Sequence, residues 1–170
     1  MKPSPAQERI THYHGQRLAA ADLTDDARYE TRMRGLHVRG SHNTWGVAIG
    51  FSVSRQSEQV LRIGPGLAYD AYGREVVSTE TLDLGRPILP AEGDAWWFEL
   101  VVSYDEAIDQ GRWGSGCLAS QPALERPRWR WCLAGTAVPG QAPAPFAASV
   151  RLGVDVPLVR CLVTRDGGFS

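Results

Sequence analysis

Residues 96–102 read Trp-Trp-Phe-Glu-Leu-Val-Val, the most apolar short run of the chain. A run of this length, rich in aromatic and β-branched side chains, is typical of a β-strand covered on both faces. Residues 128–133, Arg-Trp-Arg-Trp-Cys-Leu, alternate between polar and apolar types and are its predicted hairpin partner. Residues 156–164 form a third predicted strand. These segments predict an antiparallel sheet with the 96–102 strand at its centre.

A second alternating segment lies upstream, at residues 45–54. Alternate residues of a strand point to the same side, so one side carries large side chains and the other small ones. We expect a core contact for Trp45, Val47, Ile49, Phe51 and Val53. The small side, with Gly46 and Gly50, would allow a helix or a second chain to approach closely. Short strands at 59–63, 67–70 and 74–78, separated by glycine turns, predict a meander or small barrel.

A helix is predicted over residues 22–40. Asp22 is the expected N-terminal cap, and Gly40 the expected C-terminal stop. Acidic residues crowd the first turn and basic residues the last, as the helix dipole favours. The apolar stripe is narrow, so Arg28, Arg32 and Arg39 are expected to face water or a partner.

These elements predict an α+β fold, mainly β, in which an N-terminal helix packs on an antiparallel β-sandwich or small barrel with long loops. A single domain is expected over residues 1–170, with a flexible segment at 1–10 and a β-rich core at 45–164. The long loops are expected at 105–127 and 135–149. The chain stops soon after its last predicted strand, as one module of a longer architecture would.

Composition excludes several classes of function. The chain has 18 basic and 19 acidic residues, a balance that disfavours nucleic-acid binding. No apolar run reaches the roughly 18 residues of a membrane span, and no targeting segment is recognisable. Three cysteines without CxxC spacing favour a reducing compartment, although one disulfide plus a free thiol fits as well.

The sequence carries only weak motifs for catalysis. The chain has no GxSxG, GxGxxG or P-loop motif, so no cofactor is expected. His12 and His14 are weak metal candidates because alternate imidazoles of a strand could reach one ion; hydrogen bonding to backbone is the favoured interpretation. Asp70 and Glu75 flank a tight turn, where acids bond local amides, with a glycosidase pair as the weaker alternative.

The cysteines and tryptophans carry two further alternatives. Cys117 follows Gly-Ser-Gly and could be an exposed nucleophile, but no histidine is spaced to activate it. Cys132 and Cys161 are expected to be small core residues. Trp129 and Trp131 could stack on sugars, whereas a cross-strand aromatic and charge ladder is the favoured interpretation.

Three segments together form an ordered pattern: 14–23 (HGQRLAAADL), 42–53 (HNTWGVAIGFSV) and 63–77 (IGPGLAYDAYGREVV). This pattern resembles a family of phage-tail-like baseplate and tail-fibre-associated proteins, found with contractile phage tails and extracellular contractile injection systems. Weaker similar signatures follow at 100–106, 125–131 and 156–159. The chain departs from the family at Arg17, Ala19 and Phe51, and it has Ala71 and Tyr72 where the family commonly has cysteines.

The resemblance implies a structural, non-enzymatic subunit or adaptor, made in the cytoplasm and incorporated in the particle. The expected partners are other tail, baseplate or fibre subunits and further copies of the chain, as in a homo-oligomer such as a trimer. The predicted partner-binding residues are Arg28, Arg32, Arg39, Gly46, Gly50 and Trp113. The alternative function is a carbohydrate-binding module that uses Trp113, Trp129 or Trp131.

Overall fold

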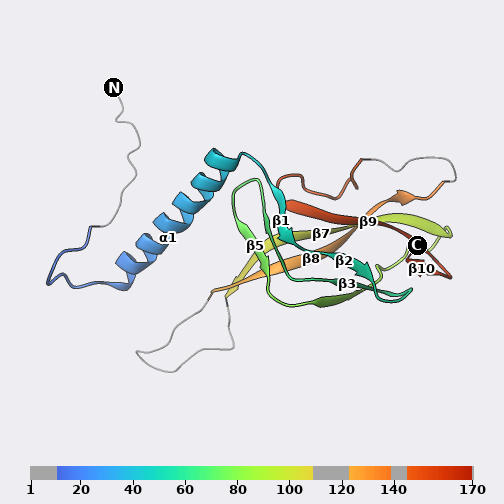
Figure 1. Ribbon diagram of the computed structural model, residues 1–170, viewed down its shortest axis with the longest axis horizontal. Helices are drawn as coiled ribbons and strands as arrows, with labels where there is room; N and C mark the ends of the chain where they lie inside the picture. The colour runs from blue at the N-terminus through green and yellow to red at the C-terminus, as the bar shows by residue number, and fades with distance from the viewer. Residues whose placement is uncertain (1–10, 109–122, 139–144, 170) are drawn as a thin grey trace. The chain divides into compact units, whose positions relative to one another are not determined.

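The computed structural model describes residues 11–108, 123–138 and 145–169 (Figure 1). The chain divides into two compact units, Met1–Thr44 and Trp45–Ser170. The first holds the helix α1 (Ala20–His37) and the π-helical turn η1 (Val38–His42). The second holds the strands β1 (Gly46–Gly50), β2 (Val53–Arg55), β3 (Val60–Ile63), β4 (Gly66–Tyr69), β5 (Glu75–Ser78), β6 (Leu82–Gly85), β7 (Ala95–Ile108), β8 (Ala123–Thr136), β9 (Asp155–Thr164) and β10 (Gly168–Phe169).

This composition of elements confirms the predicted class, α+β and mainly β. The single domain predicted for residues 1–170, with the helix packed on the β-rich core, stays a prediction. The segment 1–10, predicted to be flexible, lies outside the described residues.

The helix is displaced from its predicted limits. It begins at Ala20 because Asp22 acts from inside the first turn, where its carboxylate accepts the backbone N–H of Ala19 at 2.8 Å. Gly40 is not the stop, because the backbone continues through η1 and reaches the left-handed conformation only at Asn43, with φ of 44°. No residue of α1 is buried. Among the described residues, neither helical element is long and apolar enough to cross a membrane.

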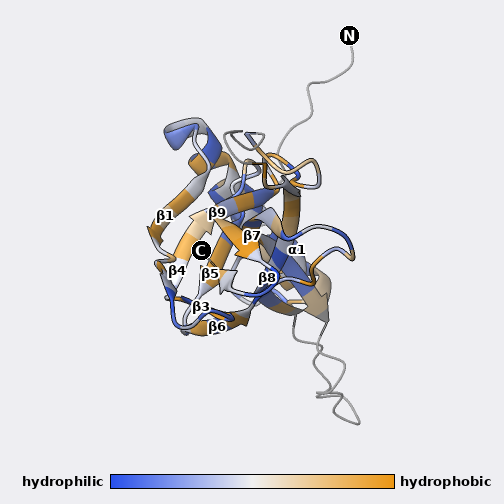
Figure 2. Cartoon of the chain, turned by 90° about the vertical axis from the view of Figure 1, so that its right-hand side faces the viewer, coloured by the Kyte–Doolittle hydropathy of each residue, from blue (hydrophilic) through white to orange (hydrophobic). Residues whose placement is uncertain are grey.

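The strands of the second unit form three antiparallel sheets, with the orders β1-β4-β5, β10-β9-β7-β8 and β2-β3-β6 over the described residues. β7 pairs with β8 on one side and with β9 on the other, which confirms the predicted hairpin and the central position of the 96–102 run. Every residue from Phe98 to Ser103 is buried. Figure 2 shows the hydrophobic colouring of β7, and also orange segments on β1.

The core of the second unit draws on all three sheets. β5 lies beside β8, and β1 lies beside β9, so the first two sheets meet along two edges as in a small barrel. The main cluster contains Phe51, Ile63, Ala68, Val76, Leu100, Val102 and Val156. A second cluster surrounds Trp96 and includes Cys161, while Cys132 lies in a third, which confirms that both cysteines are core residues.

The predicted face of the Trp45 segment is wrong. Ile49 is 69% exposed and Val47 is 45% exposed, whereas Phe51 is buried. A β-bulge between Val47 and Ile49 inserts an extra residue, which re-aims the side chains relative to the partner strand. Gly50 and Phe51 then take positive φ values of 71° and 51°, so β1 ends there and the chain turns toward the third sheet.

The hairpin of β7 and β8 is longer than predicted. Pairing between β7 and β9 ends at Ser103, but residues 104–108 continue to pair with residues 123–127 of β8 as a two-stranded ribbon. The predicted loop 105–127 is therefore wrong at both ends, and Trp113 and Cys117 lie outside the described residues. This ribbon extends past β9 and carries charged side chains. Its sequence therefore lacks the apolar alternation that marks a covered strand. The loop predicted at 135–149 also begins later, since β8 includes residues 135 and 136.

Candidate interaction surface

The outer face of the β1-β4-β5 sheet carries a row of apolar side chains, which we name the Ile49 face. Ile49 lies opposite Leu67, and Leu67 lies opposite Val77, so the three residues share one side of the sheet. Ile49 is 69% exposed, Val77 is 47% exposed and Leu67 is half-buried. A contiguous apolar row on a rigid sheet is the kind of surface that marks a protein–protein contact.

The reverse side of the same sheet is also apolar, and it contributes to the core of the second unit. Ala68 and Val76 lie opposite each other and are 0% and 1% exposed. They belong to the main core cluster together with Phe51. The sheet therefore buries one apolar side in its own core and leaves a second apolar side, the Ile49 face, at the surface.

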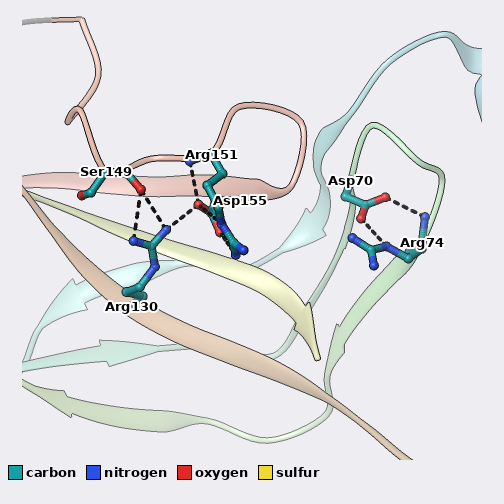
Figure 3. A network of polar contacts seen from close by, with 6 residues as sticks. All are labelled: Asp70, Arg74, Arg130, Ser149, Arg151 and Asp155. Carbon is teal, nitrogen blue, oxygen red and sulfur yellow. Dashed lines mark hydrogen bonds and ion pairs between the residues drawn. The ribbon is translucent and has the colours of Figure 1, made fainter. Parts of the chain in front are cut away.

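A buried carboxylate fixes the turn between β4 and β5, the two strands that carry Leu67 and Val77. Asp70 accepts the backbone N–H groups of Tyr72 and Arg74, both at 2.9 Å, and the Arg74 Nε at 2.6 Å (Figure 3). The Asp70 side chain is 0% exposed. The guanidinium of Arg74 also stacks over the ring of Tyr104, 5.0 Å from its centroid. These contacts confirm the prediction that Asp70 bonds local amides.

A second buried carboxylate, Asp155, lies at the start of β9 and holds two arginines. Arg130 donates to Oδ2 at 2.5 Å, and Arg151 donates to Oδ1 at 2.8 Å (Figure 3). Arg130 also donates to the carbonyl oxygen of Ser149 at 3.1 Å. Burial by itself raises the pKa of Asp155, but the hydrogen bonds from Arg151 and the charges of both arginines outweigh it and hold the pKa below its usual value.

These two carboxylates stabilise neighbouring segments of backbone. The N–H of Ala71, in the turn that Asp70 fixes, donates to the carbonyl oxygen of Gly153, in the loop that Asp155 fixes, at 2.8 Å. A third buried acid, Glu99 of β7, accepts the N–H of Ala147 at 2.7 Å and bonds to Arg160. The buried acids thus secure the loops around the sheets, and Asp70 in particular secures the strands under the Ile49 face.

The weak metal candidates, His12 and His14, belong to no larger cluster of ligands among the described residues. His12 lies 3.9 Å from Asp26, and His14 is exposed. Within residues 11–108, 123–138 and 145–169, no group of three or more His, Cys, Asp or Glu side chains could hold a metal ion. His37 and His42 contact each other edge to face, with ring centroids 5.6 Å apart.

The predicted arginines of the helix are exposed and make local contacts. Arg28 pairs with Asp25 at 3.3 Å, one turn earlier. Arg39 donates its Nε to the carbonyl oxygen of Gly35 at 3.4 Å. Their exposure leaves partner binding by Arg28, Arg32 and Arg39 as a prediction.

The two glycines predicted to contact a partner, Gly46 and Gly50, have different surroundings. At Gly50, the approaching backbone is that of Pro65 and Gly66 from the same chain, because a Cβ built there would fall on the Pro65 carbonyl oxygen. Gly50 therefore serves the fold, and its predicted contact with a partner chain stays a prediction. Gly46 has open space around its Cβ position, so its partner contact stays a prediction.

The tryptophans proposed for sugar stacking are half-buried and engaged with the core. Trp129 contacts Phe51 edge to face, with ring centroids 5.7 Å apart. Trp131 donates its Nε1–H to the carbonyl oxygen of Gly85 at 3.1 Å and packs near Phe169. These contacts agree with the cross-strand packing interpretation, and glycan binding stays a prediction.

The Ile49 face and the Asp155 cluster were not predicted as sites from the sequence, which placed Ile49 in the core. The sequence did contain a signal for a different buried ion pair. Glu99 interrupts the apolar 96–102 run, and a charge inside a strand that is covered on both faces requires a partner. That partner is Arg160, which lies opposite Glu99 on β9. The Ile49 face gave no such signal, because it depends on the bulge in β1.

Comparisons with known proteins give one weak likeness. No protein-family model matches the chain. No curated protein matches it either. A solved chain from a type VI secretion system TssK-TssF-TssG baseplate subcomplex is 12% identical with a TM-score of 0.48, over 96% of this chain. This chain spans 59% of the length of that one, and a similarity at this level does not establish a shared function.

Proposed function

We propose that the chain is a structural, non-enzymatic subunit or adaptor of a phage-tail-like particle, and that it acts through protein–protein contacts at the Ile49 face. The observation that carries this proposal is the apolar row of Ile49, Leu67 and Val77, which reaches the surface on a sheet whose other side contributes to the core. The order of the three motifs in residues 14–77, which resembles baseplate and fibre-associated proteins, supports the kind of particle.

The geometry of this face suits docking rather than chemistry. Its side chains are aliphatic and offer no nucleophile or proton donor, but they can be removed from water at a gain of about 25 cal/mol for each Å² of apolar surface. The face rests on a turn held by the buried Asp70, so little conformational freedom is lost when a partner binds.

The test is co-purification of the tagged full chain with the products of neighbouring tail genes. Wild type should retain at least one of these products, and Ile49→Asp should lose it because a charge would be buried at the contact. Ile88→Asp is the matched control, since Ile88 is 96% exposed and lies outside the Ile49 face. A wild-type chain that stays monomeric at high concentration and retains no tail protein would contradict the proposal.

A further inference from the structure

The four-stranded sheet has an outer face that a short segment covers. Leu100 and Val102 of β7 belong to the main core cluster, so Val101, between them on the strand, points to the opposite side of the sheet. There Val101 packs with Cys132 of β8 and with two residues of the segment 145–152. We name residues 145–152 the strap.

The strap buries little apolar surface of its own. Its two buried residues are Ala147 and Val150, which are 3% and 9% exposed, and its other residues are exposed. Because the gain from apolar burial scales with area, one alanine and one valine stabilise the closed strap far less than the main cluster stabilises the sheets.

A first charged pair of the sheet holds the backbone of the strap. Glu99 of β7 and Arg160 of β9 bond to each other. Glu99 also accepts the N–H of Ala147 at 2.7 Å, and Arg160 also donates to the carbonyl oxygen of Pro145. The strap therefore lies on groups whose charges are already paired within the sheet.

A second charged pair holds the other end of the strap (Figure 3). Arg130 of β8 donates to Asp155 of β9 and also to the carbonyl oxygen of Ser149 in the strap, at 3.1 Å. The strap adds one charge of its own here, because Arg151 donates its backbone N–H to Asp155 Oδ2 at 2.7 Å and its guanidinium to Oδ1 at 2.8 Å.

Both charged pairs stay complete when the strap leaves. Glu99 keeps Arg160, and Asp155 keeps Arg130, because all four residues belong to strands of the sheet. Opening therefore avoids the large penalty of an unpaired buried charge, and water replaces the hydrogen bonds to the strap backbone. The end of the strap is fixed by the next residue, Gly153, which has φ of 83° and accepts a backbone N–H from the turn between β4 and β5.

We infer that the strap is a conformational device: it opens as a unit about Gly153 while the three sheets stay folded, and it controls access to the outer face around Val101 and Cys132. A segment with few buried apolar contacts opens at a lower free energy than the whole fold. The inference does not use the Ile49 face, so it is independent of the proposed function.

Thiol labelling at two positions tests the opening in the full-length protein. Iodoacetamide is added to native protein, and mass spectrometry follows the peptides that contain Cys132, beneath the strap, and Cys161, in the cluster around Trp96. Each rate is divided by the rate of the same cysteine in urea-unfolded protein. Cys132 should then react at least about tenfold faster than Cys161, and its rate should rise less steeply at low urea, because local opening exposes less surface than global unfolding.

Two variants separate local opening from global unfolding. Arg151→Ala removes the ionic contact of the strap with Asp155, so it should raise the Cys132 rate about fivefold. Ile63→Val is the matched control, because Ile63 lies in the main cluster and is packed whether the strap is closed or open. It should leave the Cys132 rate unchanged while it raises the Cys161 rate about fivefold.

Three results would overturn the inference. The first is a Cys132 rate no faster than the Cys161 rate. The second is an equal response of both cysteines to Ile63→Val, since Cys132 would then become accessible only by global unfolding. The third is an Arg151→Ala variant with an unchanged Cys132 rate, because the opening that exposes this thiol would then not involve the strap.

Discussion

β7 and β1 carry similar apolar side chains, yet the fold uses them in opposite ways. β7 lies between β8 and β9, and its residues from Phe98 to Ser103 are buried on both faces. β1 pairs with β4 at the edge of a three-stranded sheet, carries a bulge, and leaves Ile49 largely in water. The comparison teaches that hydrophobic alternation identifies a strand, whereas the position of the strand in its sheet decides whether its apolar side is core or surface.

The sharpest test of this comparison uses two neighbours that the alternation treats as equivalent. Phe51→Ala should lower the free energy of unfolding by about 3–5 kcal/mol, because Phe51 is buried in the main cluster and its loss leaves a cavity. Ile49→Ala should change it by no more than about 0.5 kcal/mol, provided that the protein is measured where it does not assemble. Guanidinium unfolding of both variants checks this; equal losses would show that β1 is as much a core strand as β7.

The next test removes the acid that holds the loop before β9. Asp155→Asn should destabilise the protein by about 1.5–3 kcal/mol at pH 7, the contribution of hydrogen bonds to a charged group, and toward the lower end because both arginines are partly exposed. Arg62 and Asp83 form a surface pair, so Asp83→Asn is a control with little expected effect.

The pH dependence of the same variant has a defined sign. The pKa of Asp155 is lowered in the folded state, so its contribution is complete above the usual Asp value of 3.8 and is lost as the pH falls through the folded pKa. The difference in stability between wild type and Asp155→Asn should therefore shrink below about pH 4. A difference that stays constant from pH 6 to pH 2.5 would contradict the assigned role.

A further comparison concerns the two ends of β1, with Gly46 at its first residue and Gly50 at its last. Gly46→Ala should cost about 1–3 kcal/mol through backbone strain alone, since Gly46 has φ of 128° and open space around it. Gly50→Ala adds an overlap with Pro65, so it should cost about 1–3 kcal/mol more than Gly46→Ala. Thermal or chemical unfolding of the pair measures the difference; similar losses would mean that Pro65 yields easily and that the end of β1 is less constrained than described.

The last test uses the unaltered protein and concerns β9, the strand that pairs with β7. Burial raises the pKa of the Cys161 thiol to about 11, from an ordinary value of 9.0. At pH 8.5 much less of this thiol is then in the reactive thiolate form, so iodoacetamide should label Cys161 far more slowly in native protein than in urea. Mass spectrometry of the peptide containing Cys161 follows both rates, and comparable rates would place β9 away from the interior.

The strands around β7 could be predicted because their signal is local. The 96–102 run, the alternating 128–133 segment and the 156–164 segment each carry enough apolar side chains to indicate a strand, and their order in the sheet follows from hairpin pairing. The predicted limits of α1 differ from the observed ones by two residues at the start and three at the end, because acidic and basic residues mark the ends of a helix only approximately.

The candidate surface could not be predicted because it depends on contacts between distant segments. The bulge in β1 shows only when β4 is laid beside it, and a single extra residue exchanges the faces of a strand. The Asp155 cluster likewise joins residues 25 positions apart, Arg130 and Asp155. Such pairs follow from the tertiary fold, and the local sequence of neither segment predicts them.

The ribbon that β7 and β8 form beyond β9 constrains how its length can change in evolution. Side chains alternate between its two sides, so a single inserted residue on each strand would exchange the side of every pair farther along, including the opposed Glu106 and Glu125. Insertion of two residues on each strand preserves the sides and extends the ribbon by about 6.7 Å. In related chains, each strand of the ribbon should therefore be longer or shorter by an even number of residues, while the four-stranded part of the sheet keeps its register.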